Sequence, residues 1–292
     1  MTEANATPSR RVAIVTDSTA DLDTADARAR GIDVVPLFVN FGDARFRDRI
    51  DLSLDEFYRK LASLSVLPTT AQPTPAMFED AFRLHVESGR AVVCLTIMGS
   101  LSGTINAANT AAHAFPGAEI HVVDSETVAG GLALLAQSAA DVANAGGDAH
   151  AVLDTLMRDR ARLRGWASIP DLSHVVRTGR VSRAQAFVGS LVKIVPVLRI
   201  EHGAIEPHAR VRTFARAVDT MVDAAAAETN AADGARVCVM HSHAAELART
   251  VLEKVRAKTT TANASFELLE AGPVIGTHAG PGAAGIFVIP GP

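Results

Sequence analysis

Short apolar runs rich in β-branched residues alternate with longer amphipathic segments along the first 150 residues of the chain. A strand that is buried on both faces has this continuous apolar character, and the segments between the runs have the period of a surface helix. The strands expected on this basis are 12–15, 34–39, 91–97 and 120–123. The helices expected are one that ends near Gly31, 55–64, 75–87, 102–115 and 128–144. Alternation of strand and helix predicts a mostly parallel sheet.

The pattern changes after about residue 150. The segments expected there are a helix at 151–163, an apolar stretch at 166–169, a polar stretch at 172–182, extended runs at 193–200 and 202–211 joined by a turn, helices at 213–228 and 244–257, and a strand at 236–240. This order is typical of an α+β domain with hairpins. The 292 residues are enough for two domains. We therefore predict an α/β fold with a parallel βα domain at 1–160 and an α+β domain at 161–292.

Composition and charge exclude several classes of protein. The net charge of −4 argues against a nucleic-acid-binding domain, which is expected to be basic. The first eleven residues are polar and lack the apolar core of a signal peptide, and no run reaches the ~20 apolar residues that span a bilayer. Cys94 and Cys238 both lie inside apolar runs, which indicates buried thiols in strands. We expect a cytoplasmic protein.

Four polar clusters interrupt the apolar pattern, at 69–73, 100–104, 177–182 and 272–282. The first precedes a helix, and its threonines are more simply explained as helix caps. The second follows a strand and opens a helix, where free backbone N–H groups and the helix dipole suit an anion such as a carboxylate. The third has two arginines around Gly179, an arrangement that is usually a solvated turn. The fourth has four glycines and two prolines around His278, a density that predicts a tight, special loop.

Several catalytic motifs are missing from these clusters. The Gly-x-Ser-x-Gly elbow of hydrolases is absent at Ser102, because Ser100 and Thr104 stand where the glycines would be. The chain has no nucleotide-binding lysine motif and no His, Asp and Glu grouping with the spacing of metal ligands. We expect no metal, no covalent cofactor and no nucleotide bound by this chain alone.

Taken together and in order, seven segments resemble the DegV family, the fatty-acid-binding subunit (FakB) of bacterial fatty acid kinase. They cover the chain from about residue 12 to 289. The matching segments are 16–22, 70–73, 101–104, 123–125, 179–182, 211–213 and 276–282. Each segment alone is weak evidence for the family, whereas the whole set in this order, ending in Gly276-Thr277-His278, is specific for it.

The resemblance implies a carrier with one long-chain fatty acid held in a cleft between its two domains. It implies that the carboxylate meets Thr70, Ser102 and His278. The residues expected to support that site are Gln72, Gly103, Thr104, Gly276, Thr277 and Gly280. It further implies that Arg180 and Arg212 serve docking of the kinase catalytic subunit or phosphoryl transfer. That separate subunit brings ATP and magnesium and makes an acyl-phosphate for phospholipid synthesis, so this chain is not expected to be an enzyme by itself.

Elementary energetics agree with the carrier hypothesis. Burial gains ~0.8 kcal/mol per CH₂, so a sixteen-carbon tail supplies on the order of 10 kcal/mol before ordering costs. A buried carboxylate needs hydrogen bonds or a counter-charge, and two hydroxyls with an imidazole meet that need. The chain departs from the family in three places: Ala71 replaces a serine, Thr178 replaces a glycine, and 173–176 lacks the usual tyrosine.

Two alternatives remain open at this level. Ser102 and His278 could act as nucleophile and base of an acyl transferase or hydrolase. The chain could also be a relative of dihydroxyacetone kinase subunits, in which case a histidine would bind a polar sugar covalently. The sequence leaves open the acyl length and saturation, the oligomeric state, the existence of a kinase partner, and peripheral contact with a membrane.

Overall fold

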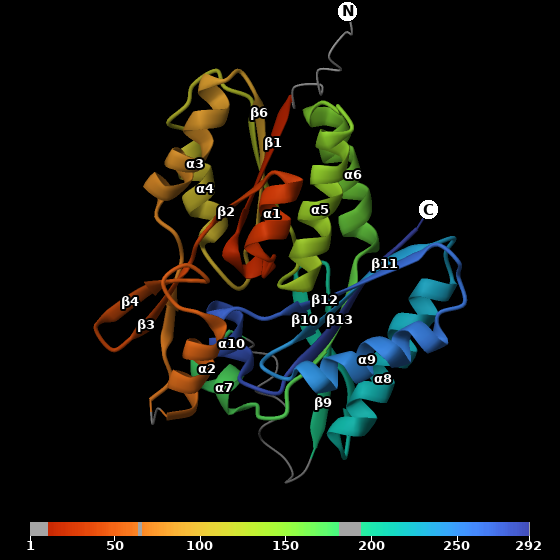
Figure 1. Ribbon diagram of the computed structural model, residues 1–292. Coiled ribbons are helices and arrows are strands. Elements are labelled where there is room, and N and C mark those ends of the chain that lie inside the picture. The colour runs from red at the N-terminus through yellow and green to blue at the C-terminus, as the bar shows by residue number, and fades with distance from the viewer. Residues whose placement is uncertain (1–10, 64–65, 181–193, 292) are drawn as a thin grey trace, which may run out of the picture.

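The computed structural model describes residues 11–63, 66–180 and 194–291 as three sheets with helices packed around them (Figure 1). The first sheet has the order β2-β1-β6-β7, and every pair of neighbouring strands in it is parallel. Its strands are β1 (Val12–Asp17), β2 (Ile32–Val35), β6 (Ala91–Thr96) and β7 (Ile120–Asp124). The predicted parallel βα arrangement is confirmed.

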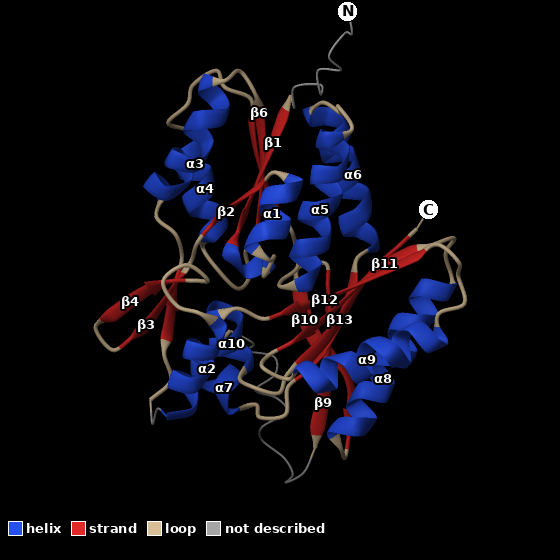
Figure 2. Ribbon diagram, in the orientation of Figure 1, coloured by secondary structure: helices blue, strands red, loops and turns tan. Residues whose placement is uncertain are grey.

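Helices cover both faces of this sheet, as the sequence pattern requires of a parallel sheet (Figure 2). The helices of this half are α1 (Thr24–Arg30), α3 (Pro75–Glu87), α4 (Thr104–Ala112), α5 (Gly130–Asn144) and α6 (Ala149–Arg162). α3 and α4 form one apolar layer with Ala13, Val15 and Cys94. The opposite face packs against α5, which is buried along nearly its whole length because it also contacts the third sheet.

The second sheet is small and was not predicted. It has the order β4-β3-β5, all antiparallel, and its strands are β3 (Phe38–Phe41), β4 (Ala44–Arg47) and β5 (Thr69–Ala71). The single strand expected at 34–39 is wrong: the chain leaves the first sheet after Val35 and enters the second at Phe38. Pro36 lies at this break and has no N–H to donate to a strand ladder.

The third sheet is mixed and has the order β10-β9-β8-β13-β11-β12. Its strands are β8 (Arg164–Ser168), β9 (Val195–Glu201), β10 (Ala204–Val211), β11 (Ala235–His241), β12 (Ala264–Glu270) and β13 (Ala284–Pro290). β9 and β10 form the predicted hairpin, although the expected start of that run at Lys193 lies outside the described residues. Helices α8 (Phe214–Asn230) and α9 (Ala245–Lys258) cover one face of this sheet, and the other face points toward α5.

The chain passes from the first half to the second at Leu163, between α6 and β8. This crossing lies close to the division that we predicted at 160/161, which stays a prediction. α10 (Pro273–Ala279) returns from the second half and packs on α2 (Leu54–Ser63) and the small sheet, so the halves are interleaved. Among the described residues, no helix is both long and apolar enough to cross a bilayer.

Candidate functional site

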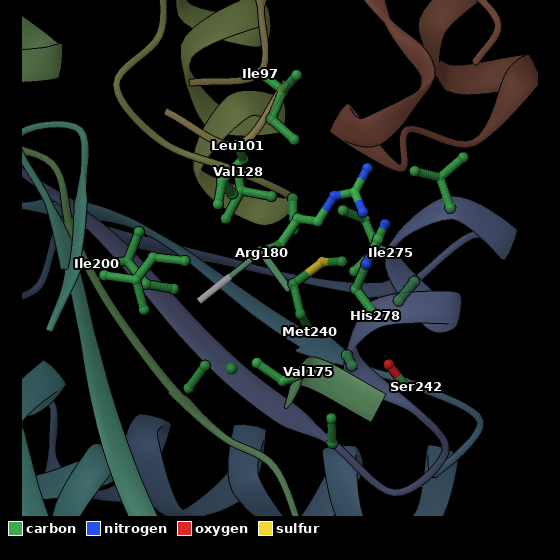
Figure 3. Close-up of a pocket in the computed structure, with 18 of the residues that line it drawn as sticks. Ile97, Leu101, Val128, Val175, Arg180, Ile200, Met240, Ser242, Ile275 and His278 are labelled. Carbon is green, nitrogen blue, oxygen red and sulfur yellow. The ribbon is translucent and has the colours of Figure 1, made fainter. Parts of the chain in front are cut away.

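A cavity of about 470 Å³ lies between the two larger sheets and is lined mainly by aliphatic side chains (Figure 3). Pockets for small molecules have volumes of this order. Apolar wall residues include Leu37, Ile97, Leu101, Val128, Ile200, Met240, Ile275 and Phe287. Polar wall residues are Thr70, Gln72, Ser102, Arg180, His241, Ser242 and His278. The cavity therefore combines a large apolar surface with a small set of hydrogen-bonding groups.

Thr70 and His278 meet at the polar side of this cavity. The hydroxyl Oγ1 of Thr70 lies 2.9 Å from Nε2 of His278. Thr70 is placed by its pairing with Val39 in the small sheet, and His278 lies in the last turn of α10, which packs against that sheet. The second ring nitrogen of His278, Nδ1, is buried and has no hydrogen-bond partner. The described residues therefore leave one ring nitrogen of His278 unsatisfied, at a point shielded from solvent.

Ser102 lies on the same cavity wall, in the loop just before α4. Its hydroxyl is 2.8 Å from the hydroxyl of Thr104 and accepts a hydrogen bond from the Thr104 backbone N–H. Gly103 between them lets the amide of Gln72 approach, because a Cβ at this position would overlap the Gln72 side-chain oxygen. The loop before α4 and the end of β5 are thus in contact, and both face the cavity.

The charge state of His278 follows from its surroundings. Burial in the cavity wall, with the nearby Arg180 guanidinium as the second cause, lowers the pKa of His278 to about 4. The imidazole of the ligand-free protein is therefore neutral at pH 7. A positive charge is still present, because Arg180 lies on the cavity wall close to His278 (Figure 3).

α10 is helical where a special loop was expected at 272–282, so that prediction is wrong for residues 273–279. Pro273 occupies the first turn, where its missing N–H is harmless. Gly276 faces the aromatic pair of α2: a Cβ there would lie 2.7 Å from Phe57 and 2.8 Å from the Tyr58 hydroxyl. Gly280 ends the helix with a φ of +69°. The glycines therefore allow a short helix to dock closely.

Two further residues of the predicted supporting set hold this helix. Thr277 is fully buried and donates its hydroxyl to the carbonyl of Pro273. Gly280 lies against His174, which a Cβ would approach to 2.8 Å. His174 belongs to α7 (Ser173–Thr178), a helix in the stretch that we described only as polar. Gly179 follows the last residue of α7, and its φ of +69° gives the expected turn before Arg180.

Sequence reasoning missed a buried acidic cluster that anchors α10. Asp21 accepts a hydrogen bond from the Gly272 N–H at 2.8 Å, and Asp48 accepts one from the Val274 N–H at 3.3 Å. Asp48 also accepts from the Ser18 hydroxyl at 2.7 Å. Burial raises the pKa of Asp48 to about 6 and raises the pKa of Asp21 as well. Asp21 lies in an acidic segment directly after a buried strand, 16–22, which the family resemblance used without giving it a role, whereas Asp48 lies outside that segment.

The two arginines predicted for the partner surface occupy different places. Arg180 is exposed, lines the cavity and donates to the carbonyl of Thr178. Arg212 is exposed between β10 and α8 and is not on the cavity wall. Of the motif that contains Arg180, the residues Val181 and Ser182 lie outside the described residues. The structure therefore brings Thr70, Ser102, His278 and Arg180 to one cavity and leaves Arg212 on the surface.

A Ser–His nucleophile pair is not formed in the described part of the chain. Ser102 is hydrogen bonded to Thr104, and His278 is hydrogen bonded to Thr70. Nucleophilic catalysis requires the base within hydrogen-bond reach of the nucleophile. Among the described residues, no group of His, Cys, Asp and Glu could hold a metal ion. Cys94 and Cys238 are buried in β6 and β11, as predicted.

The architecture defines an α/β protein with an apolar ligand cavity between two sheets, and the comparisons with known proteins give its family. The family model "Uncharacterised protein, DegV family" matches residues 11–291. A DegV domain-containing protein of Halalkalibacterium halodurans is 35% identical over 94% of this chain and 97% of its own length. The chain belongs to the DegV family.

Solved structures are also closely similar to this chain. A DegV family protein from Thermus thermophilus, described as fatty-acid binding, has a TM-score of 0.89 and 32% identity, and the match covers 96% of this chain and 99% of that one. A stearic-acid-binding protein from Eubacterium ventriosum has a TM-score of 0.87 and 25% identity, with 96% and 98% covered. The predicted family and fold class are confirmed.

Proposed function

We propose that this protein is a fatty-acid carrier that holds one long-chain fatty acid in the cavity between its two larger sheets. The observation that carries the proposal is the pairing of an aliphatic cavity of about 470 Å³ with the Thr70–His278 contact on its wall. The fatty-acid-binding relatives from Thermus thermophilus and Eubacterium ventriosum support it, because they share this fold over nearly their whole length.

The acyl tail would lie against the aliphatic wall and the carboxylate against Thr70, Ser102 and His278. Removal of the tail from water supplies most of the binding free energy, at ~0.8 kcal/mol per CH₂. The carboxylate needs donors and a counter-charge in such a site. The Ser102 hydroxyl can donate, and so can whichever group of the hydrogen-bonded Thr70–His278 pair keeps a free proton. The Arg180 guanidinium supplies the charge that a neutral histidine does not.

The carrier would present its carboxylate to the catalytic subunit of a fatty acid kinase. That partner would bring ATP and magnesium and transfer the γ-phosphoryl group to a carboxylate oxygen, giving an acyl-phosphate and ADP. Arg180 at the cavity and the exposed Arg212 are the residues we assign to docking or to stabilising the transferred group. We further propose that the chain works in the cytoplasm and itself supplies no nucleotide or covalent cofactor.

Two experiments test these proposals separately. Mass spectrometry of protein purified without detergent should show one fatty acid per chain, and protein that neither carries nor takes up fatty acid would overturn the carrier proposal. The kinase step is tested by ADP release when the loaded carrier is mixed with a fatty acid kinase catalytic subunit, ATP and magnesium. Release that does not depend on the carrier, or no release with a subunit shown to be active on another carrier, would overturn that step alone.

A further inference from the structure

The register of the third sheet shows where the cavity ends. Side chains that face the cavity come from alternate residues of neighbouring strands, so they form rows across the sheet. The row in the middle of the cavity wall is Leu198, Ala167, Gly285 and Met240. The next row is Ile200, Gly165, Phe287 and Cys238, of which only Ile200 and Phe287 are on the wall. The following residue of β13 on this face, Ile289, is buried and is not on the wall. The cavity therefore stops at the row of Phe287.

The ring of Phe287 is wedged into a slot made by three glycines. A Cβ would lie 2.9 Å from the ring at Gly130, 3.0 Å at Gly131 and 2.7 Å at Gly165. Gly165 separates Phe287 from Ile200 in the row, so the ring extends over Gly165 toward Ile200. The ring fills the space that a side chain at each of these glycines would take, so Phe287 is packed on three sides and forms part of a close-packed wall.

This wall lies at the apolar end of the cavity. Both wall residues of this row, Ile200 and Phe287, are apolar, and Gly130 and Gly131 of α5 lie against the Phe287 ring. Ile200 and His278 lie on opposite sides of the cavity in Figure 3. A ligand whose acidic end is held at His278 would therefore direct its tail toward Phe287.

We propose that Phe287 is the residue that limits acyl chain length, because it closes the tail end of the cavity. The proposal rests on the carrier function proposed above. An acid whose tail fits short of the ring gains affinity with every added methylene, by about fourfold each. Once the tail reaches the ring, further methylenes gain nothing or lose affinity, because the wall does not yield.

The test is a set of binding measurements on delipidated protein with the saturated series from dodecanoic to eicosanoic acid. Phe287→Ala should move the optimum to a longer acid and raise the affinity for eicosanoic relative to hexadecanoic acid by about tenfold or more. Phe287→Leu should give a smaller shift in the same direction and guards against loss of folding in the first variant. The matched control is Ile289→Ala, which truncates a buried side chain on the same face of the same strand without enlarging the cavity wall.

The possible outcomes separate the two proposals. If Phe287→Leu and Phe287→Ala change affinity for all acids by one common factor, or if Ile289→Ala shifts the profile equally, the length limit is overturned while the carrier function stands. If the unaltered protein binds no acid of the series, the carrier function fails and the length limit fails with it. Thermal melts of all variants establish that the binding profiles refer to folded protein.

Discussion

Nε2 of His278 lies 2.9 Å from the hydroxyl oxygen of Thr70, although 208 residues separate the two in the sequence. The contact joins the small sheet to α10 and therefore the first half of the chain to the second. One group of the pair accepts a hydrogen bond from the other, so the pair keeps one O–H or N–H free for a ligand beside an aliphatic cavity. The fatty-acid proposal depends on this contact more than on any other.

Replacement of Thr70 by valine should weaken fatty-acid binding without unfolding the protein. Valine has nearly the same shape but cannot donate to a carboxylate, and a hydrogen bond to a charged group contributes about 1.5–3 kcal/mol. We expect affinity for hexadecanoic acid to fall about tenfold to a hundredfold in calorimetric titration. The matched control is Thr69→Val, since Thr69 is exposed and is not on the cavity wall. Equal affinities of the two variants would contradict the assignment of Thr70.

The pKa of His278 can be measured by NMR titration of the ligand-free protein, and we expect a value of about 4. The substitution Arg180→Gln removes the nearby positive charge, which is the second cause of the low pKa of His278, and should therefore raise this pKa. The value should remain below the usual 6.5, because burial is the larger cause. Arg177→Gln, on the exposed side of α7, should leave it unchanged. A His278 pKa near 6.5 in the unaltered protein would show that the ring is solvated.

The lowered pKa of His278 also predicts part of the pH dependence of the free energy of unfolding. Because the folded-state pKa of His278 lies below the unfolded value, the unfolded chain binds more protons between pH 6.5 and pH 4. This group therefore makes the free energy of unfolding fall as the pH falls through that window. A His278→Gln variant should lose this contribution, which urea denaturation at a series of pH values would measure. A pH dependence identical to that of the unaltered protein would contradict the assignment.

Asp48 should affect the free energy of unfolding in the opposite direction, making it rise as the pH falls. Its folded-state pKa of about 6 lies above the usual 3.8, so its stabilising contribution is complete below pH 3.8 and is lost as the pH rises through 6. Asp48→Asn keeps the shape but cannot titrate. From pH 7 to pH 4 the unaltered protein should gain on the order of 3 kcal/mol relative to this variant in denaturant unfolding. A pH-independent difference would contradict the buried position of the carboxyl.

Gly276→Ala should destabilise the protein, although the same change in an ordinary helix stabilises it by about 1 kcal/mol. The added methyl would overlap Phe57 and the Tyr58 hydroxyl, and α10 would have to move away from α2. We expect a loss of about 1–3 kcal/mol in unfolding and weaker fatty-acid binding, because α10 carries His278. A higher melting temperature would show that α10 does not dock this closely.

The sequence predicted best where the local pattern decides the structure. The helix expected at 75–87 is observed with those bounds, because Pro75 begins it and its apolar residues recur with helical spacing. The run at 34–39 looked like one strand, and its division at Pro36 between two sheets depends on what each part pairs with. Apolar character alone does not specify a pairing partner.

The residues of the site could be predicted from the sequence, whereas the elements and contacts that position them could not. Thr70, Ser102 and His278 came from the family resemblance, and all three lie on one cavity wall. The helix that carries His278 was not foreseen, since its glycines indicated a loop and the reason for Gly276 is tight packing against α2. Asp48 was missed because its role is a hydrogen bond to α10, far away in sequence.

Calorimetric titration of delipidated protein with hexadecanoic acid, beside a variant that combines Thr70→Val, Ser102→Ala and His278→Gln, tests the central claim most directly. We predict one binding site per chain in the unaltered protein, and affinity reduced by a factor of a hundred or more in a variant that still folds. No binding by the unaltered protein, or equal binding by both, would show that these three side chains do not hold a fatty acid.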